Sequence, residues 1–274
     1  MATANPAFNT PEFRGQGAAA AQGGVVAAQN MTAEQLDEIY RRASGPAEGE
    51  TMTVEDTIAK TVGAFVLLLA GAAIGWLTVD SIPFLWIGAG IVGFILAMVN
   101  IFRKQPSAPL VLAYSAVQGV FVGGISAFYE REFPGIVVQA VLATLVVVGV
   151  TLALFASGRI RASKRATKIF LIAMVGYLVF SMINVGIMIF GGAGGNAWGL
   201  SGSVEIFGIK LGLILGVLVV ILAAYSLVLD FDMIQRGVAN KAPRNYGWRG
   251  AFGIMVTVIW LYLELLRMLG IARS

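Results

Sequence analysis

The chain has 274 residues, of which 58% are hydrophobic and 12% are charged. Soluble domains carry about one charged residue in four, so this composition excludes an ordinary water-soluble protein. The chain contains no Cys and no His, which excludes disulfides and the common zinc sites and leaves acid–base or ion chemistry to carboxylates. The net charge of +4 comes from cations between apolar blocks, as in membrane proteins. We expect no nucleic-acid partner, no metal site and no cofactor.

Residues 1–51 are predicted to form a cytoplasmic tail, since they contain no long apolar stretch. Their Ala-, Gly- and Gln-rich part, 15–29, has few large side chains and is predicted to be disordered. A capping box at 32–35 is followed by apolar residues with helical spacing, which predicts a short amphipathic helix. This helix would lie on the membrane, dock on the rest of the protein, or stay solvated.

Seven apolar blocks follow, each close to the roughly twenty residues that a helix needs to cross a bilayer. We predict transmembrane helices at about 62–79, 84–102, 109–128, 135–156, 169–190, 209–229 and 251–269. The first block is predicted to be an uncleaved signal anchor, because no signal peptide precedes it. A capping box at Thr53–Asp56 would start its helix a turn or two before the lipid. Residues 52–274 thus form an all-α domain with seven transmembrane helices.

The loops between these blocks carry an asymmetric charge. Loops two, four and six hold eleven Lys and Arg residues, whereas loops one, three and five hold two, Arg131 and Lys210. Because Lys and Arg are retained in the cytoplasm, this bias predicts a cytoplasmic N-terminus and an outside C-terminus.

Small residues recur inside the predicted spans. Gly119, Gly123 and Gly124 lie in the third span, and Gly212 and Gly216 form a GxxxG spacing in the sixth. Such residues let helix backbones approach closely. We interpret them as packing positions rather than substrate contacts.

Three carboxylates lie in or at the end of a predicted span, where each is costly unless it is paired, protonated or wetted. Asp230 and Asp232 end the sixth span, and two residues apart on a helix they point in different directions. One interpretation is that both cap the transition to water, with Arg236 as an i,i+4 partner of Asp232. Glu264 either pairs with Arg267 at i,i+3 or faces a wet cavity in which its charge would depend on pH.

Several motifs together resemble the Bax inhibitor-1/YccA family, also called the transmembrane Bax inhibitor motif family. They are Tyr114-Ser115-Ala116-Val117-Gln118-Gly119, Leu229-Asp230-Phe231-Asp232 and Leu261-Tyr262-Leu263-Glu264-Leu265-Leu266-Arg267. The likeness covers about 52–270. The segments Asn5-Pro6-Ala7-Phe8 and Met52–Asp56 are similar to a bacterial branch of the family.

The resemblance implies a seven-helix bundle whose last helix is enclosed by the other six. In some members it implies a pH-dependent calcium leak, gated by two aspartates that share a proton. Asp230 matches the first of these positions, whereas Thr257 stands at the second. Glu264 lies seven residues later on nearly the same helix face. Gln118 stands where the family has an acidic residue in span three.

Two functions of different classes follow from the resemblance. The first is a pH-sensitive calcium or cation leak in the plasma (inner) membrane that contributes to ion homeostasis and stress protection. Its predicted ion or proton pathway comprises Asp230, Glu264, Asp232, Thr257 and Gln118. The alternative is a non-conducting regulator of a membrane-bound protease or stress pathway, to which the long tail and the missing second aspartate point. Proton-coupled transport of a small solute also stays open. We expect no enzyme, because no nucleophile has a base beside it.

Overall fold

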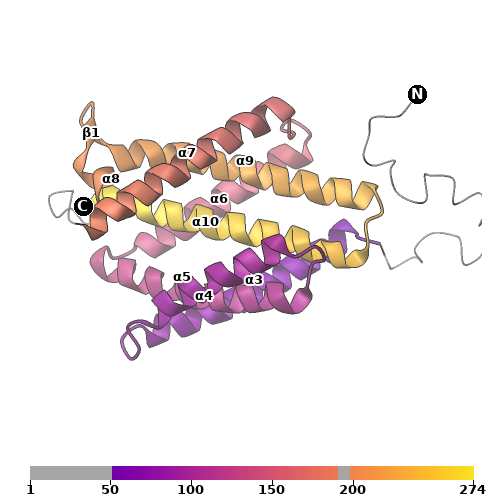
Figure 1. The fold of residues 1–274 in the computed structure, drawn as a ribbon, viewed down its shortest axis with the longest axis horizontal. Helices are drawn as coiled ribbons and strands as arrows, with labels where there is room; N and C mark the ends of the chain where they lie inside the picture. Colours follow the sequence, from indigo (N-terminus) through magenta and orange to yellow (C-terminus); the bar gives the residue numbers. More distant parts are fainter. Residues whose placement is uncertain (1–50, 191–197) are drawn as a thin grey trace, which may run out of the picture. The chain divides into compact units, whose positions relative to one another are not determined.

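The computed structural model describes residues 51–190 and 198–274, so residues 1–50 of the predicted tail, with its amphipathic helix, lie outside the described residues. Within the described residues, seven helices are long and apolar enough to cross a membrane, which confirms the predicted all-α fold. The elements, labelled as in Figure 1, are α3 (Val54–Thr78), α4 (Leu85–Phe102), α5 (Ala108–Glu132), α6 (Ile136–Ala156), α7 (Lys164–Ile189), α8 (Leu200–Ser203), β1 (Glu205–Ile206), β2 (Ile209–Lys210), α9 (Leu211–Ala239), η3 (Arg244–Tyr246) and α10 (Gly247–Arg273). The protein is therefore a multi-pass membrane protein.

The helices extend beyond the apolar blocks at several ends. The capping box starts α3 as predicted, because the amide of Asp56 donates to Thr53 Oγ1 at 3.1 Å. At the other end of the domain, α9 continues ten residues past the predicted end at 229, to Ala239. Asp230 and Asp232 therefore lie within a helix, and side chains one turn away can reach them.

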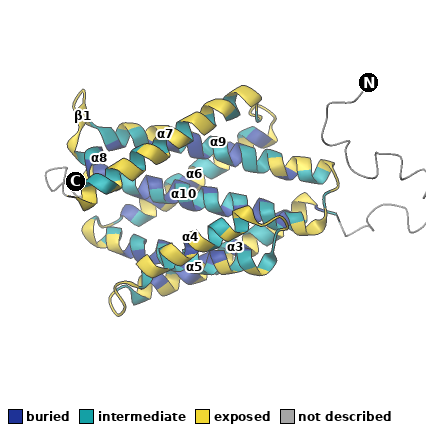
Figure 2. Ribbon diagram, in the orientation of Figure 1, coloured by how far each residue is buried: buried dark blue, intermediate teal, exposed yellow. Residues whose placement is uncertain are grey.

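The last helix, α10, forms the centre of the bundle. It runs between α9 on one side and α3 to α5 on the other (Figure 1), and it also packs against α6. Its buried positions extend from Gly247 to Ile271, and Met255, Leu261 and Leu266 are almost completely inaccessible. Figure 2 shows this concentration of buried positions along α10. Of the six helices predicted to enclose it, four, α3, α5, α6 and α9, form most of its contacts.

The fifth span, α7, lies at the outside of the bundle. None of its 26 residues is buried, and Figure 2 shows exposed positions along its length. Large apolar side chains on this helix are about two-thirds exposed or more, for example Ile169 (67%), Met182 (68%) and Ile189 (72%). Such a surface is stable against lipid tails, which are as apolar as these side chains.

The predicted small-residue positions are sites of close packing. A Cβ at Gly212 would meet Ile271 of α10 and Ser201 of α8, and a Cβ at Gly216 would meet Met268 of α10. A Cβ at Gly119 or Gly123 would overlap the backbone of α3. The interpretation of these glycines as packing positions is confirmed.

Candidate functional site

Asp230 of α9 and Thr257 of α10 meet directly. The Thr257 hydroxyl donates to Asp230 Oδ2 at 2.7 Å, and Ser226 Oγ lies 3.2 Å from Thr257 Oγ1. Since the single hydroxyl proton of Thr257 goes to Asp230, Ser226 must be the donor in the second contact. The result is a short polar chain from Ser226 through Thr257 to the carboxylate.

The helical spacing on both sides creates this contact. Ser226 and Asp230 are four residues apart on α9, and Gly253 and Thr257 are four apart on α10, so each pair shares a face. Gly253 leaves room for the carboxylate, because a Cβ there would lie 2.7 Å from Asp230 Oδ1. Ser226 was missed in the sequence analysis, although its spacing from Asp230 is a readable signal.

The charge of Asp230 is not matched by a cation. In the part of the chain that the structure describes, no Lys or Arg forms an ion pair with it. Asp232, by contrast, pairs with Arg236 at the predicted i,i+4 spacing. The two aspartates thus point in different directions, as their spacing predicts.

Glu264 lies in a second polar cluster farther along α10. Arg267 Nε donates to Glu264 Oε2 at 3.2 Å, and Arg267 Nη2 pairs with Oε1. The Tyr177 hydroxyl of α7 also donates to Oε2, at 2.8 Å. Glu264 is 4% exposed and Arg267 is 23% exposed. The structure therefore contains the i,i+3 pair that the sequence offered as one of two interpretations.

A cavity adjoins this cluster but does not join it to Asp230. The cavity has a volume of about 750 Å³ and is lined by α5, α7 and α10, with Glu264 and Arg267 on its wall and Asp230 absent from it. Seven residues of helix separate Glu264 from Thr257, a rise of about 10 Å. Glu264 thus does not take the place of the missing second aspartate beside Asp230.

Gln118 of α5 also lies away from Asp230. Its Oε1 is buried and, among the described residues, has no hydrogen-bond partner. The same atom lies against Gly93 of α4, where a Cβ would overlap it. Of the five predicted pathway residues, the structure brings together only Asp230 and Thr257.

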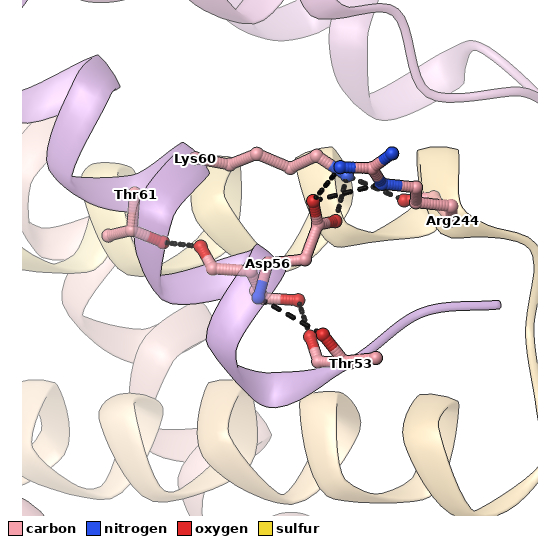
Figure 3. Close-up of polar contacts among 6 residues, drawn as sticks. Thr53, Asp56, Lys60, Thr61 and Arg244 are labelled. Carbon is pink, nitrogen blue, oxygen red and sulfur yellow. Dashed lines mark hydrogen bonds and ion pairs between the residues drawn. The ribbon is translucent and has the colours of Figure 1, made fainter. Parts of the chain in front are cut away.

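A further polar cluster fixes the loop between α9 and α10 to the start of α3 (Figure 3). Asp56 Oδ1 accepts from Arg244 Nε at 3.0 Å and from Nη2 at 2.7 Å, and Asp56 Oδ2 accepts from Lys60 Nζ at 2.5 Å. Lys60 Nζ also donates to the Arg244 carbonyl at 2.7 Å. The Asp56–Lys60 spacing is readable from the sequence, but the partner Arg244, far along the chain, is not.

Comparison with known proteins places these features in a family. The model of the family described as Bax inhibitor 1 like matches residues 5–274, which is nearly the whole chain. No curated protein matches the chain. The match extends the likeness from the transmembrane domain into the N-terminal segment. The chain therefore belongs to the Bax inhibitor 1 like family.

Proposed function

We propose that this protein is a pH-sensitive leak for calcium or other cations, with Asp230 as the residue that binds the ion or the proton. It would act in the plasma (inner) membrane, in ion homeostasis and stress protection. The observation that carries the proposal is the contact between Asp230 of α9 and Thr257 of α10 at 2.7 Å. In some family members the corresponding contact is the aspartate pair that gates a calcium leak.

The physical argument starts from the cost of a carboxylate between apolar helices. Such a group needs a proton, a cation or hydrogen-bond donors. Asp230 has one donor, Thr257, and no ion-pair partner in residues 51–190 and 198–274. A proton or a cation therefore competes for the same oxygens that hold α9 to α10. Either one would change the contact between the two helices.

Thr257 alters the expected pH response. Two aspartates share a proton and titrate as a pair, whereas an aspartate beside a threonine titrates alone. We infer a single protonation step in this protein.

Calcium flux through liposomes tests the proposal. Purified protein is reconstituted into liposomes that contain a calcium dye. The initial calcium flux is then measured at pH values from about 5 to about 8, the range that includes physiological pH. Asp230→Asn, which mimics the protonated carboxyl, should show a flux without pH dependence. Asp232→Asn is the matched control, because Asp232 is two residues away and pairs with Arg236.

A further variant tests the single protonation step. Thr257→Asp restores a second carboxylate beside Asp230 and should add a second step to the pH profile. Equal profiles for wild type and Asp230→Asn would contradict the proposal. Equal effects of Asp230→Asn and Asp232→Asn would also contradict it. Liposomes without any protein-dependent flux would favour the non-conducting regulator instead.

A further inference from the structure

A cavity separate from Asp230 lies between the start of α7 and the second half of α9. Its volume is about 830 Å³. Its walls are formed by both helices and the segment before α7, at the end of the bundle predicted to be cytoplasmic. It is lined by Ala162, Ser163, Lys164, Thr167, Lys168, Leu171, Ile172, Leu229, Asp232, Met233 and Arg236.

The lining changes from cationic to apolar along the helices. Lys164, Lys168 and Arg236 contribute positive charge, and Asp232 is the one carboxylate in the lining. Asp232 pairs with Arg236, and no carboxylate of the described residues pairs with Lys164 or Lys168. Farther from the predicted cytoplasmic end, the lining is apolar: Leu171, Ile172 and Leu229. This polarity matches an amphiphile with an anionic head.

The start of α7 has an unbalanced positive charge. Its first turns carry Lys164, Arg165 and Lys168, and its first turn has no acidic residue. The N-terminal end of a helix already has a positive dipole, which acidic groups normally offset. An anion bound there would neutralise the side-chain cations and would also offset the positive dipole of the helix N-terminus.

The rim of the cavity is held in place by Tyr225 of α9. Its hydroxyl lies 2.9 Å from Thr167 Oγ1 and donates to the Ser163 carbonyl at 3.3 Å. Its ring packs against Phe170, with 5.5 Å between the ring centroids. Since no residue of α7 is buried, these contacts tie its first turns to α9. The cavity is thus a formed site between two helices.

We propose that this cavity binds the phosphate group of an anionic membrane lipid. Lys164, Lys168 and Arg236 bind the phosphate, and an acyl chain lies along Leu171 and Leu229. A free phosphate would use the cations but would leave the apolar wall without a ligand group. Basic pockets between transmembrane helices on the cytoplasmic side are suited to lipid headgroups.

The lipid would contact residues of α9 other than the proposed gate. Asp232 and Met233 line the cavity, whereas Asp230 faces Thr257 of α10. The site therefore does not depend on ion conduction, and lipid binding is measured without any flux.

Native mass spectrometry of the purified full chain tests the proposal. The protein is titrated with phosphatidylglycerol and with phosphatidylcholine of the same acyl chains, and inorganic phosphate serves as a competitor. We expect one phosphatidylglycerol to bind about tenfold more tightly than phosphatidylcholine, given the attraction of each cation to an anionic lipid. Lys164→Gln/Lys168→Gln should remove this preference. Arg103→Gln/Lys104→Gln is the matched control, because it removes two cations from another loop predicted to be cytoplasmic.

A charge-conserving variant distinguishes the loss of the binding cations from a loss of folded protein. Lys164→Arg/Lys168→Arg should keep the preference for phosphatidylglycerol. Equal binding of the two lipids by the wild type would overturn the proposal. An equal loss in the cavity variant and the control would assign the effect to general surface charge and overturn it too. Binding of inorganic phosphate without a lipid preference would overturn the assignment to a lipid.

Discussion

At the scale of single residues, Glu264 and Arg267 place two opposite charges inside the bundle. Glu264 is 4% exposed and accepts from both Arg267 and Tyr177. The carboxylate is therefore bonded at both oxygens, which offsets part of the cost of removing it from water. The pair depends on both partners, since neither charge has another ion-pair partner among residues 51–190 and 198–274.

Removing one partner should therefore cost more than removing both. Arg267→Gln leaves the carboxylate of Glu264 buried without its cation, and we expect a loss of about 3–5 kcal/mol in the free energy of unfolding. Glu264→Gln/Arg267→Gln removes both charges and should lose clearly less. Denaturant titration of the protein in detergent measures both values. If the double variant were as unstable as Arg267→Gln, the ion pair would not be the source of the loss.

The sequence predicts the contacts within one helix better than those between helices. The pairs Asp232–Arg236 and Glu264–Arg267 follow from helical spacing alone. The bond from Tyr177 of α7 to Glu264 and the position of Gln118 against α4 depend on how each helix is rotated about its axis. The spacing of residues along the chain does not determine how each helix is rotated against its neighbours.

At the scale of elements, α3 and α5 pack through two facing pairs of glycines. Gly71 and Gly75 of α3 and Gly119 and Gly123 of α5 each have the GxxxG spacing. A Cβ on any of the four would overlap a backbone oxygen of the other helix. The two backbones are therefore in contact, and no side chain fits between them.

A methyl group at this interface should push the helices apart. We expect Gly123→Ala to lower the free energy of unfolding by about 1–3 kcal/mol, the usual cost of overpacking. Gly149→Ala is the matched control in α6, because no atom of another helix lies within 4 Å of the added Cβ. It should be neutral or stabilise by up to about 1 kcal/mol, since Ala favours helix more than Gly does. Thermal or denaturant unfolding compares the two, and equal losses would contradict the role of the close contact.

The elements themselves were predictable because lipid imposes their length. Hydropathy locates all seven spans, since each must satisfy its own backbone hydrogen bonds across the hydrocarbon. The helix ends were less predictable. α9 extends to Ala239, and Asp232 and Arg236 form an i,i+4 pair on this extension.

At the scale of the whole domain, the first and last spans are joined at one end. Thr51 forms an isolated β-bridge with Pro243, and the amide of Met52 donates to the Ala242 carbonyl at 2.7 Å. Asp56 then pairs with Arg244, whose side chain is 62% exposed. Arg244 donates twice to Asp56, and Lys60 pairs with the same carboxylate, so the backbone contacts and this charge network together hold the loop. This arrangement fixes the start of α10, on which Thr257 lies.

The orientation of the domain is predicted from loop charge, and the Cys-free chain allows a direct test. Glu205 in the hairpin before α9 and Lys241 after it are both exposed and lie on opposite sides of one span. Since loop six is rich in cations, we expect Lys241 in the cytoplasm and Glu205 outside. In intact cells, a membrane-impermeant maleimide should label Glu205→Cys, whereas Lys241→Cys should react only after permeabilisation. The reverse pattern would invert the topology and place the proposed lipid site in the outer leaflet.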